Sequence, residues 1–296
     1  MVQDASWIGV MTCGAILTSH WLQESPSLLA AWHIEPPFAQ PPGIDALPGG
    51  KAASQRNAVP IYDFLNQRVV HHVLDRLPVR TGTLRAIGGF INTFAIECFM
   101  DELAHSAGID PIDLRLKHLS DERAIAAINA ARERSGLAWK RQSGSRGMGL
   151  GFARYSNEAS YAAVVVEVDV GETVKIVKAV AAVDCGRTIS PDGVANQVEG
   201  GIVQAVSWVL KEQVRFDGSR ITTRSWDDYP ILRFSEAPPV EVTIIDRPDQ
   251  PSLGMGEAVA GPTAAAIANA VFDAIGVRVR DLPLTRERMM AAINNS

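Results

Sequence analysis

Two valine-rich runs in the second half of the chain restrict its possible folds more than any other feature. They cover residues 161–170 and 174–184, and a short stretch containing Gly171 and Glu172 separates them. β-Branched runs on either side of such a turn predict a β-hairpin. Apolar residues at helical spacing then predict a helix from Pro191 to Leu210. The chain must therefore pack helices against a sheet.

The composition indicates a globular protein and excludes several classes. The chain has 296 residues, of which 47% are hydrophobic and 21% charged, enough for one large or two smaller cores. A formal net charge of −5 gives no general basic field, so nucleic acid is not an expected partner. Cys13, Cys98 and Cys185 lie far apart without a C-x-x-C pair, so no zinc site or disulfide framework is encoded locally.

Residues 1–58 are expected to form an incomplete N-terminal edge that packs on something outside this chain. An apolar run from Trp7 to Leu17 follows no Lys or Arg, and it is too short to span a membrane, so it predicts neither a signal peptide nor a membrane span. Residues 35–43 contain four prolines, which fix φ and remove backbone donors, and they predict an extended linker. No targeting signal is visible in this sequence, and a cytoplasmic and a periplasmic location both stay open.

Residues 59–145 predict a first α+β segment. Short strands are expected over residues 59–64 and 68–74, and helices over residues 95–107, 111–119 (with Asp110 as N-cap) and 121–135. Gly108 and Gly136 are expected to end the first and third of these helices. The adjacent His71 and His72 would point to opposite faces of a strand, which argues against a shared metal site.

Two glycine pairs have uncertain roles. Gly88 and Gly89 form a predicted turn before the first helix, where backbone N–H groups can hold an anion, although such a pair is more often only a turn. Gly200 and Gly201 lie inside the predicted helix at 191–210, where they cost roughly 1–2 kcal/mol relative to alanine. Either a neighbouring helix or a ligand must approach the backbone there, and spacing alone leaves both open.

Residues 146–296 predict a second α+β segment, which contains the hairpin. Glycines at positions 147, 149 and 151 precede the alternating strand pattern, but no helix follows them directly, so the dinucleotide-binding fingerprint is absent. Further strands are expected over residues 213–216, 221–225 and 240–245. An alanine-rich helix is predicted from Pro262, which suits a first turn, to the residue before Gly276.

The loop before that helix places one carboxylate, Glu257, among glycines. Glycines at positions 254, 256 and 261 let the backbone come close to another group, and no basic residue occurs from Leu253 to Ile275. A solvated surface glutamate and a site residue are both compatible with this spacing.

Several of these stretches, taken in order, carry a resemblance. They are Arg85-Ala86-Ile87-Gly88-Gly89, Asn92 to Glu97, Asp101 to Ala104, Val183 to Gly186, Asn196 to Gly201, Gly254 to Glu257 and Ala266 to Ala270. Together they resemble the molybdenum-binding large subunit of the xanthine oxidase family, especially bacterial isoquinoline 1-oxidoreductase, nicotinate dehydrogenase and related aldehyde dehydrogenases. Each motif is modest alone, whereas the ordered set is specific.

The resemblance implies an α+β fold of mixed sheets with packed helices, like the molybdenum-cofactor domain of those enzymes. It also implies oxidation of an aldehyde or an N-heteroaromatic carbon, with water as the oxygen source and Glu257 as the general base toward a molybdenum-bound hydroxide. The implied cofactor is a molybdenum–pterin group, expected in its cytosine dinucleotide form. The residues that the resemblance places beside it are Arg85, Gly88, Gly89, Gln197, Gly254 and Gly256.

Departures from the family pattern determine which partners are expected. The family's large subunit is normally much longer, and two of its cofactor-binding motifs, Met-Gly-Gln-Gly and Gly-Gly-Gly-Phe-Gly, are absent here. We therefore expect a C-terminal part that needs the N-terminal half of the molybdenum subunit as a separate chain. Iron–sulfur clusters are expected on a [2Fe-2S] electron-transfer subunit, because three scattered cysteines cannot ligate one. Ile87 stands where some members carry an aromatic that packs on the small-molecule substrate, so substrate identity stays open.

Two other interpretations remain. The chain can be a non-catalytic remnant or scaffold that binds a protein partner through the surface a missing half would cover. It can also be an unrelated α+β domain whose glycine loops match by chance.

Overall fold

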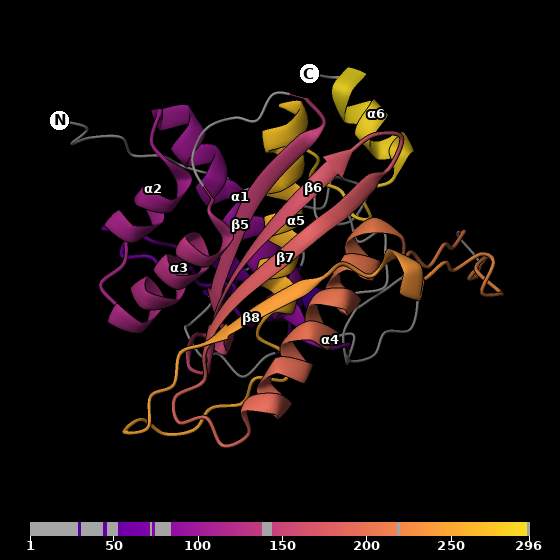
Figure 1. The fold of residues 1–296 in the computed structure, drawn as a ribbon. Coiled ribbons are helices and arrows are strands. Elements are labelled where there is room, and N and C mark those ends of the chain that lie inside the picture. Colours follow the sequence, from indigo (N-terminus) through magenta and orange to yellow (C-terminus); the bar gives the residue numbers. More distant parts are fainter. Residues whose placement is uncertain are drawn as a thin grey trace.

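The computed structural model describes residues 53–71, 73–74, 84–137, 144–217 and 220–294, together with the two-residue strands β1 (Leu29–Ala30) and β2 (Ile44–Asp45). These residues form an α+β fold in which helices cover both faces of a mixed four-stranded sheet (Figure 1). The predicted fold class is confirmed. Most of the predicted N-terminal edge, including the proline-rich linker, lies outside the described residues.

The sheet consists of β5 (Arg146–Arg154), β6 (Tyr161–Val170), β7 (Val174–Asp184) and β8 (Val240–Ile244), in that spatial order. β6 is antiparallel to both β5 and β7, and it forms the predicted hairpin with β7. β8 is parallel to β7, because the chain crosses over through helix α4 (Pro191–Leu210) before it returns to the sheet. The predicted bounds of this helix are confirmed.

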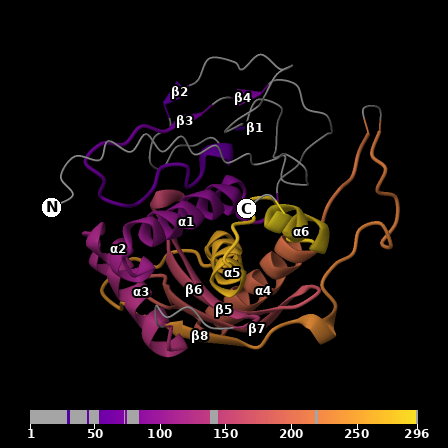
Figure 2. The ribbon, with the colours of Figure 1, turned by 90° about the horizontal axis from the view of Figure 1, so that it is seen from above.

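Helices pack on both faces of the sheet, so the inner strand β6 is buried on both sides. α5 (Ala260–Ile275) lies between α1 and α4 and packs on β5 and β6, as Figure 2 shows. α3 (Glu122–Ser135) covers the opposite face. Val164 and Val166 belong to the core beneath α5, whereas Val165 belongs to the core beneath α3. This alternation is the period of two that a strand imposes on its side chains.

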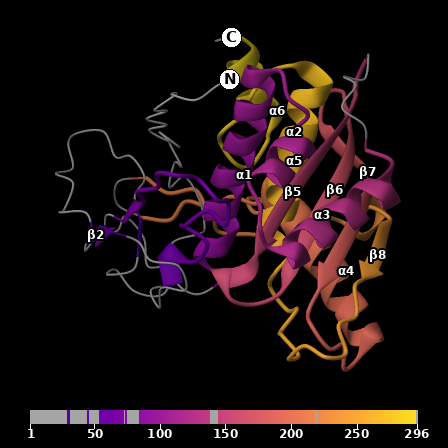
Figure 3. The same ribbon diagram turned by 90° about the vertical axis from the view of Figure 1, so that its left-hand side faces the viewer.

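The other described α-helices are α1 (Gly88–Ala107), α2 (Pro111–Lys117) and α6 (Arg286–Asn294). α1 runs beside the β5 edge of the sheet (Figure 3). Gly108, Gly136 and Gly276 follow α1, α3 and α5 with φ of 67°, 69° and 73°, so the three predicted helix ends are confirmed. No helix in the described part of the chain is both long and apolar enough to cross a bilayer.

Two glycine-rich stretches belong to regular elements that the sequence does not predict at these positions. Gly88 and Gly89 form the first turn of α1, so this helix begins at Gly88 and not at Ala95. Glycines 147, 149 and 151 lie within β5, although glycine is poorly suited to a strand. α5 packs so closely on β5 that a Cβ atom on Gly149 would lie 2.3 Å from the backbone nitrogen of Ala270. Helix packing therefore overrides the local preference.

Several predicted short strands are wrong. Residues 59–64 form no strand. Of the strand predicted over residues 68–74, the described part consists of two-residue strands, β3 (Val70–His71) and β4 (Val73–Leu74), which pair with β2 and β1. Tyr62 is buried, and its hydroxyl donates to the Glu97 carboxylate, so this segment packs into the core instead of forming the expected strand. In the described residues between α4 and β8, a single bridge from Phe216 to Ile221 replaces the two strands expected at 213–216 and 221–225.

Candidate active site

Glu257 ends the glycine loop just before α5, and its carboxylate is held from two sides. Oε1 accepts a hydrogen bond from the Ala86 N–H at 2.9 Å, and Oε2 accepts one from the Tyr155 hydroxyl at 2.8 Å. The Arg56 guanidinium lies 3.9 Å from Oε2. The Glu257 side chain is still 36% exposed, so it is both fixed and accessible. This geometry favours a site residue over a freely solvated surface glutamate.

The Ala86 N–H belongs to a strained turn at the start of α1. Ala86 and Ile87 are both buried and have φ of 72° and 50°. Residues other than glycine rarely adopt this left-handed region, and each such residue costs about 1–3 kcal/mol and persists only because its surroundings hold it. Glu257 supplies part of that support by accepting the Ala86 hydrogen bond.

Arg85 joins the glycine loop to α4. Its Nε donates to the Gly256 carbonyl at 2.5 Å, and its Nη2 donates to the carbonyl and the Oε1 of Gln197 at 2.9 and 3.0 Å. Nη1 donates to Gln204 Oε1 at 3.4 Å. Burial lowers the pKa of Arg85 and the Glu257 carboxylate opposes this change, but a guanidinium stays charged at neutral pH in either case. One cation therefore connects the loop, α4 and the strained turn.

The glycine pair in α4 allows this close arrangement. A Cβ atom on Gly201 would lie 2.6 Å from Val259 Cγ2 and 3.4 Å from Arg85 Nη2. The close approach at Gly201 therefore comes from the residue before α5 and from Arg85. At Gly200 the nearest atom to such a Cβ is Arg85 Nη1, at 3.9 Å, and this residue is exposed. The Gly200 backbone is therefore accessible to a ligand.

The structure brings most of the expected site residues together. Arg85, Gln197, Gly256 and Glu257 lie in one connected group, since Arg85 contacts two of them and a Cβ on Gly256 would lie 3.7 Å from Gln197 Oε1. Gly254 is exposed in the same loop, and a Cβ there would have no atom within 4 Å.

Gly88 and Gly89 lie behind this group, in the buried first turn of α1. A Cβ atom on Gly89 would lie 3.1 Å from Asn57 Oδ1 and 3.2 Å from Tyr155 Cε2. The Gly89 N–H already donates to the Ala86 carbonyl at 2.9 Å. Gly89 therefore makes room for protein atoms, and its N–H is already used within the turn.

Tyr155 and Arg56 contact Glu257 but were not predicted as site residues. Tyr155 is 102 residues from Glu257 and 99 residues from Arg56 along the chain. It lies in a short 3-10 turn, Tyr155–Asn157, directly after β5. No local spacing links such distant positions, so only the folded chain reveals their contact.

The residues around Glu257 suit a polar organic cofactor better than a bare metal ion. Arg85 supplies positive charge, Gln197 presents an exposed carboxamide, and Gly200 and Gly254 present exposed backbone. Among the described residues, no three His, Cys, Asp or Glu side chains come together as a protein-held metal would require. The charge of Arg85 and the exposed amide and backbone groups fit the polar, anionic part of a molybdenum–pterin group.

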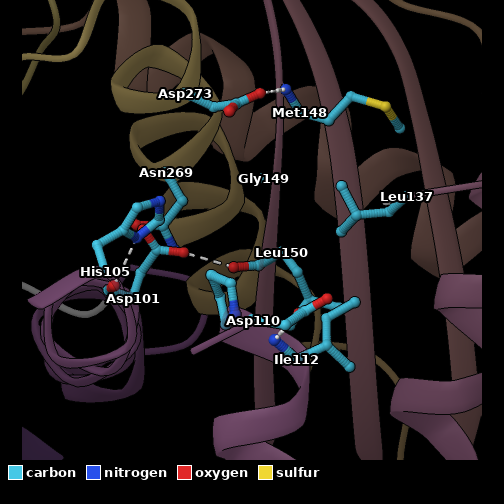
Figure 4. Close-up of a pocket in the computed structure, with 11 residues that line it drawn as sticks. Asp101, His105, Asp110, Ile112, Leu137, Met148, Gly149, Leu150, Asn269 and Asp273 are labelled. Atoms are coloured by element: carbon cyan, nitrogen blue, oxygen red, sulfur yellow. Dashed lines mark hydrogen bonds and ion pairs between the residues drawn. The ribbon is translucent and has the colours of Figure 1, made fainter. Parts of the chain in front are cut away.

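A small cavity of about 30 Å³ lies apart from Glu257, where α1 and α5 meet β5 (Figure 4). The Asn269 amide donates to the Leu150 carbonyl at 2.9 Å, and His105 Nδ1 lies 3.2 Å from Asp101 Oδ2. The cavity has room for roughly one or two water molecules. The Asn269 bond joins α5 to β5, whereas the His105–Asp101 pair lies within α1.

Two protein-family models match the chain, one over residues 99–238 and one over residues 49–119, and both describe a molybdopterin cofactor-binding domain. The chain belongs to this family. The resemblance to large subunits of the xanthine oxidase family is thereby confirmed.

Two relatives show how much of a large subunit this molybdopterin cofactor-binding domain represents. A nicotinate dehydrogenase polypeptide of Pseudomonas putida is 39% identical over 270 residues, which cover 84% of this chain and 22% of that polypeptide. The beta chain of isoquinoline 1-oxidoreductase from Brevundimonas diminuta is 33% identical over 231 residues, which cover 75% of this chain and 29% of that polypeptide. The chain thus spans less than a third of the length of either relative.

Solved structures share the fold of the molybdopterin cofactor-binding domain. The aldehyde oxidoreductase of Desulfovibrio desulfuricans superposes with a TM-score of 0.67 at 16% identity, over 81% of this chain and 45% of that one. Quinoline 2-oxidoreductase of Pseudomonas putida gives a TM-score of 0.64 at 15% identity, over 76% and 54%. At these identities the likeness concerns the fold alone.

Proposed function

We propose that the chain is the C-terminal part of a molybdenum hydroxylase that oxidises an aldehyde or N-heteroaromatic substrate with water as oxygen donor. The observation that carries this proposal is the fixed, accessible carboxylate of Glu257 beside the Arg85–Gln197 pair. The relatives named for nicotinate and isoquinoline support the heteroaromatic class. A relative named as an aldehyde oxidoreductase subunit supports the other class, although it is only 25% identical.

Glu257 acts in this proposal as the general base. Each of its oxygens accepts one hydrogen bond and keeps a lone pair, so the carboxylate can take a proton from an activated water without leaving Ala86 or Tyr155. Arg85, Gln197, Gly254 and Gly256 would hold the cofactor, with Gly88 and Gly89 supporting the turn behind them. When bound, the molybdenum–pterin group supplies Lewis-acid activation of water and accepts the substrate's electrons.

The proposed function also requires partner polypeptides and a cofactor. Because the chain spans less than a third of the compared polypeptides, we propose that it works together with the N-terminal half of a molybdenum subunit. A [2Fe-2S] subunit would take up the electrons, and the cofactor would be the cytosine dinucleotide form. Within this chain, the α+β segments 59–145 and 146–296 would act as one unit, with the edge 1–58 packed on the partner.

The test is metal and pterin analysis of the chain purified alone and after co-expression with the polypeptides encoded beside it. We expect about one molybdenum per chain only in the assembly. Glu257→Gln should keep the metal but lower turnover of aldehydes or N-heterocycles about 100- to 10,000-fold, because an essential base is lost. Glu172→Gln, at the exposed hairpin turn, is the matched control and should change neither. Metal-loaded Glu257→Gln with normal turnover would refute the base assignment.

A non-catalytic scaffold is the second candidate. Trp226 and Phe234 are 76% and 99% exposed on the segment between α4 and β8, as expected of a surface that a partner covers. Absence of molybdenum in every co-expressed assembly would favour this function.

A further inference from the structure

The Tyr155 hydroxyl lies between two charged side chains of the site. Arg56 Nη1 donates to it at 2.8 Å, and it donates to Glu257 Oε2 at 2.8 Å. Arginine can only donate and an ionised carboxylate can only accept, so the direction of both hydrogen bonds is fixed. Burial, together with the hydrogen bond to Glu257, raises the pKa of Tyr155 to about 12, so the phenol keeps its proton at neutral pH.

The Tyr155 ring has little freedom to move away from Glu257. The Asn57 side chain donates to the Arg154 carbonyl at 2.8 Å and accepts from the Ser156 N–H at 2.9 Å, so it holds the turn on both sides of Tyr155. The backbone of α1 lies directly behind the ring, where a Cβ on Gly89 would be 3.2 Å from Tyr155 Cε2.

Arg56 is held by α1 in a similar way. The Asn92 side chain donates to the carbonyls of Ser54 and Arg56 at 2.9 and 2.8 Å, which fixes the backbone of the segment that carries the guanidinium. The guanidinium also lies 5.8 Å from the centre of the Tyr155 ring. Two elements distant in sequence thus place their side chains on the same carboxylate oxygen.

We propose that Tyr155 is a positioning residue that holds the Glu257 carboxylate in a single orientation, and that Arg56 fixes the direction of the Tyr155 hydrogen bond. This inference rests on the proposed role of Glu257 as the base. The hydrogen bond at Oε2 restricts rotation of the carboxylate, so Oε1 stays on the Ala86 N–H and the strained turn keeps this support. A base that is already oriented needs no rearrangement before it takes a proton.

The test compares Tyr155→Phe with Tyr161→Phe. Tyr161, at the start of neighbouring β6, also donates its hydroxyl to a carboxylate, Asp121 Oδ2 at 2.7 Å, so the control removes the same kind of bond elsewhere. The first readout is hydrogen exchange at the Ala86 amide in the full chain. We expect faster exchange in Tyr155→Phe and unchanged exchange in Tyr161→Phe.

The second readout is kinetics of the complete, metal-loaded assembly. Tyr155→Phe should lower kcat by about 10- to 100-fold with little change in KM, because misplacing a reacting group costs that much without weakening binding. Arg56→Met removes the donor to Tyr155 together with the positive charge 3.9 Å from Glu257 Oε2. It should act in the same direction with a smaller effect, so it decides the question if Tyr155→Phe does not fold.

The outcomes separate this inference from the proposed function. Tyr155→Phe with the Ala86 exchange rate and kcat of wild type would overturn the positioning role. If Glu257→Gln abolishes turnover in the same experiment, the base role stays intact. Normal turnover in Glu257→Gln would instead refute the base role, and Ala86 exchange would then decide by itself whether Tyr155 orients the carboxylate.

Discussion

Arg115 and Glu97 form an ion pair in the core, with Arg115 Nε 2.9 Å from Glu97 Oε2 and side chains that are 0% and 1% exposed. Tyr62 also donates to this carboxylate, as does the Phe152 N–H at 3.0 Å. The pair therefore connects the segment before α1 to α1, α2 and β5. Its geometry makes a direct prediction about stability.

Replacing one partner of this pair should cost much more than replacing both charges. Arg115→Met leaves a buried carboxylate without its cation, and we expect the free energy of unfolding to fall by about 3–5 kcal/mol. Adding Glu97→Gln removes the uncompensated charge and should recover part of that loss. The exposed pair Arg146–Glu167 is the control, and Arg146→Met should cost less than about 1 kcal/mol in denaturant titrations. Equal losses in Arg115→Met and Arg146→Met would contradict this prediction.

The packing of β5 on α5 predicts that an added methyl group is not tolerated at Gly149. Its Cβ would lie 2.3 Å from Ala270 N and 2.4 Å from Ala266 O, and helix backbone cannot move aside as a flexible side chain can. Gly149→Ala should therefore lower the free energy of unfolding by about 1–3 kcal/mol or more. Gly171→Ala, at the hairpin turn with no atom within 4 Å, should stay within about 0.5 kcal/mol of wild type. If Gly149→Ala and Gly171→Ala have the same free energy of unfolding, β5 and α5 can move apart at little cost and the prediction is wrong.

Asp184 predicts a dependence of stability on acid pH. Burial favours its neutral form, but hydrogen bonds from Arg123, the Gly186 N–H and Arg247 outweigh burial and lower the pKa of this carboxyl. An aspartate with a lowered folded-state pKa stabilises the fold above its unfolded value, about 3.9, and loses that contribution as pH falls through the folded value. Asp184→Asn should therefore cost about 1.5–3 kcal/mol near neutral pH, and the difference from wild type should shrink below about pH 4.

Asp169→Asn is the control for this pH series. Asp169 lies on neighbouring β6, 4.0 Å from Arg146, and its side chain is 40% exposed. Its replacement should change the free energy of unfolding by less than about 0.5 kcal/mol at every pH. If the difference in the free energy of unfolding between wild type and Asp184→Asn stays constant through the acid range, the predicted link between Asp184 protonation and stability is refuted.

Local signals in the sequence determined much of the secondary structure. The hairpin of β6 and β7 and the bounds of α4 follow from residue type and period, and Asp110 and Gly276 mark helix ends because capping is a property of a few adjacent residues. The family is likewise recognisable from short motifs, among them the loop that ends at Glu257.

Only the tertiary structure decided which distant residues meet. Gly147, Gly149 and Gly151 have the composition of a loop, yet they form a strand because α5 packs against their missing side chains. Tyr155 reaches Glu257 across 102 residues of sequence because the end of β5 and the start of α5 meet at one end of the sheet. Periodicity describes the faces of single elements, whereas such contacts depend on how the elements pack, and the orientation of the candidate base depends on those contacts.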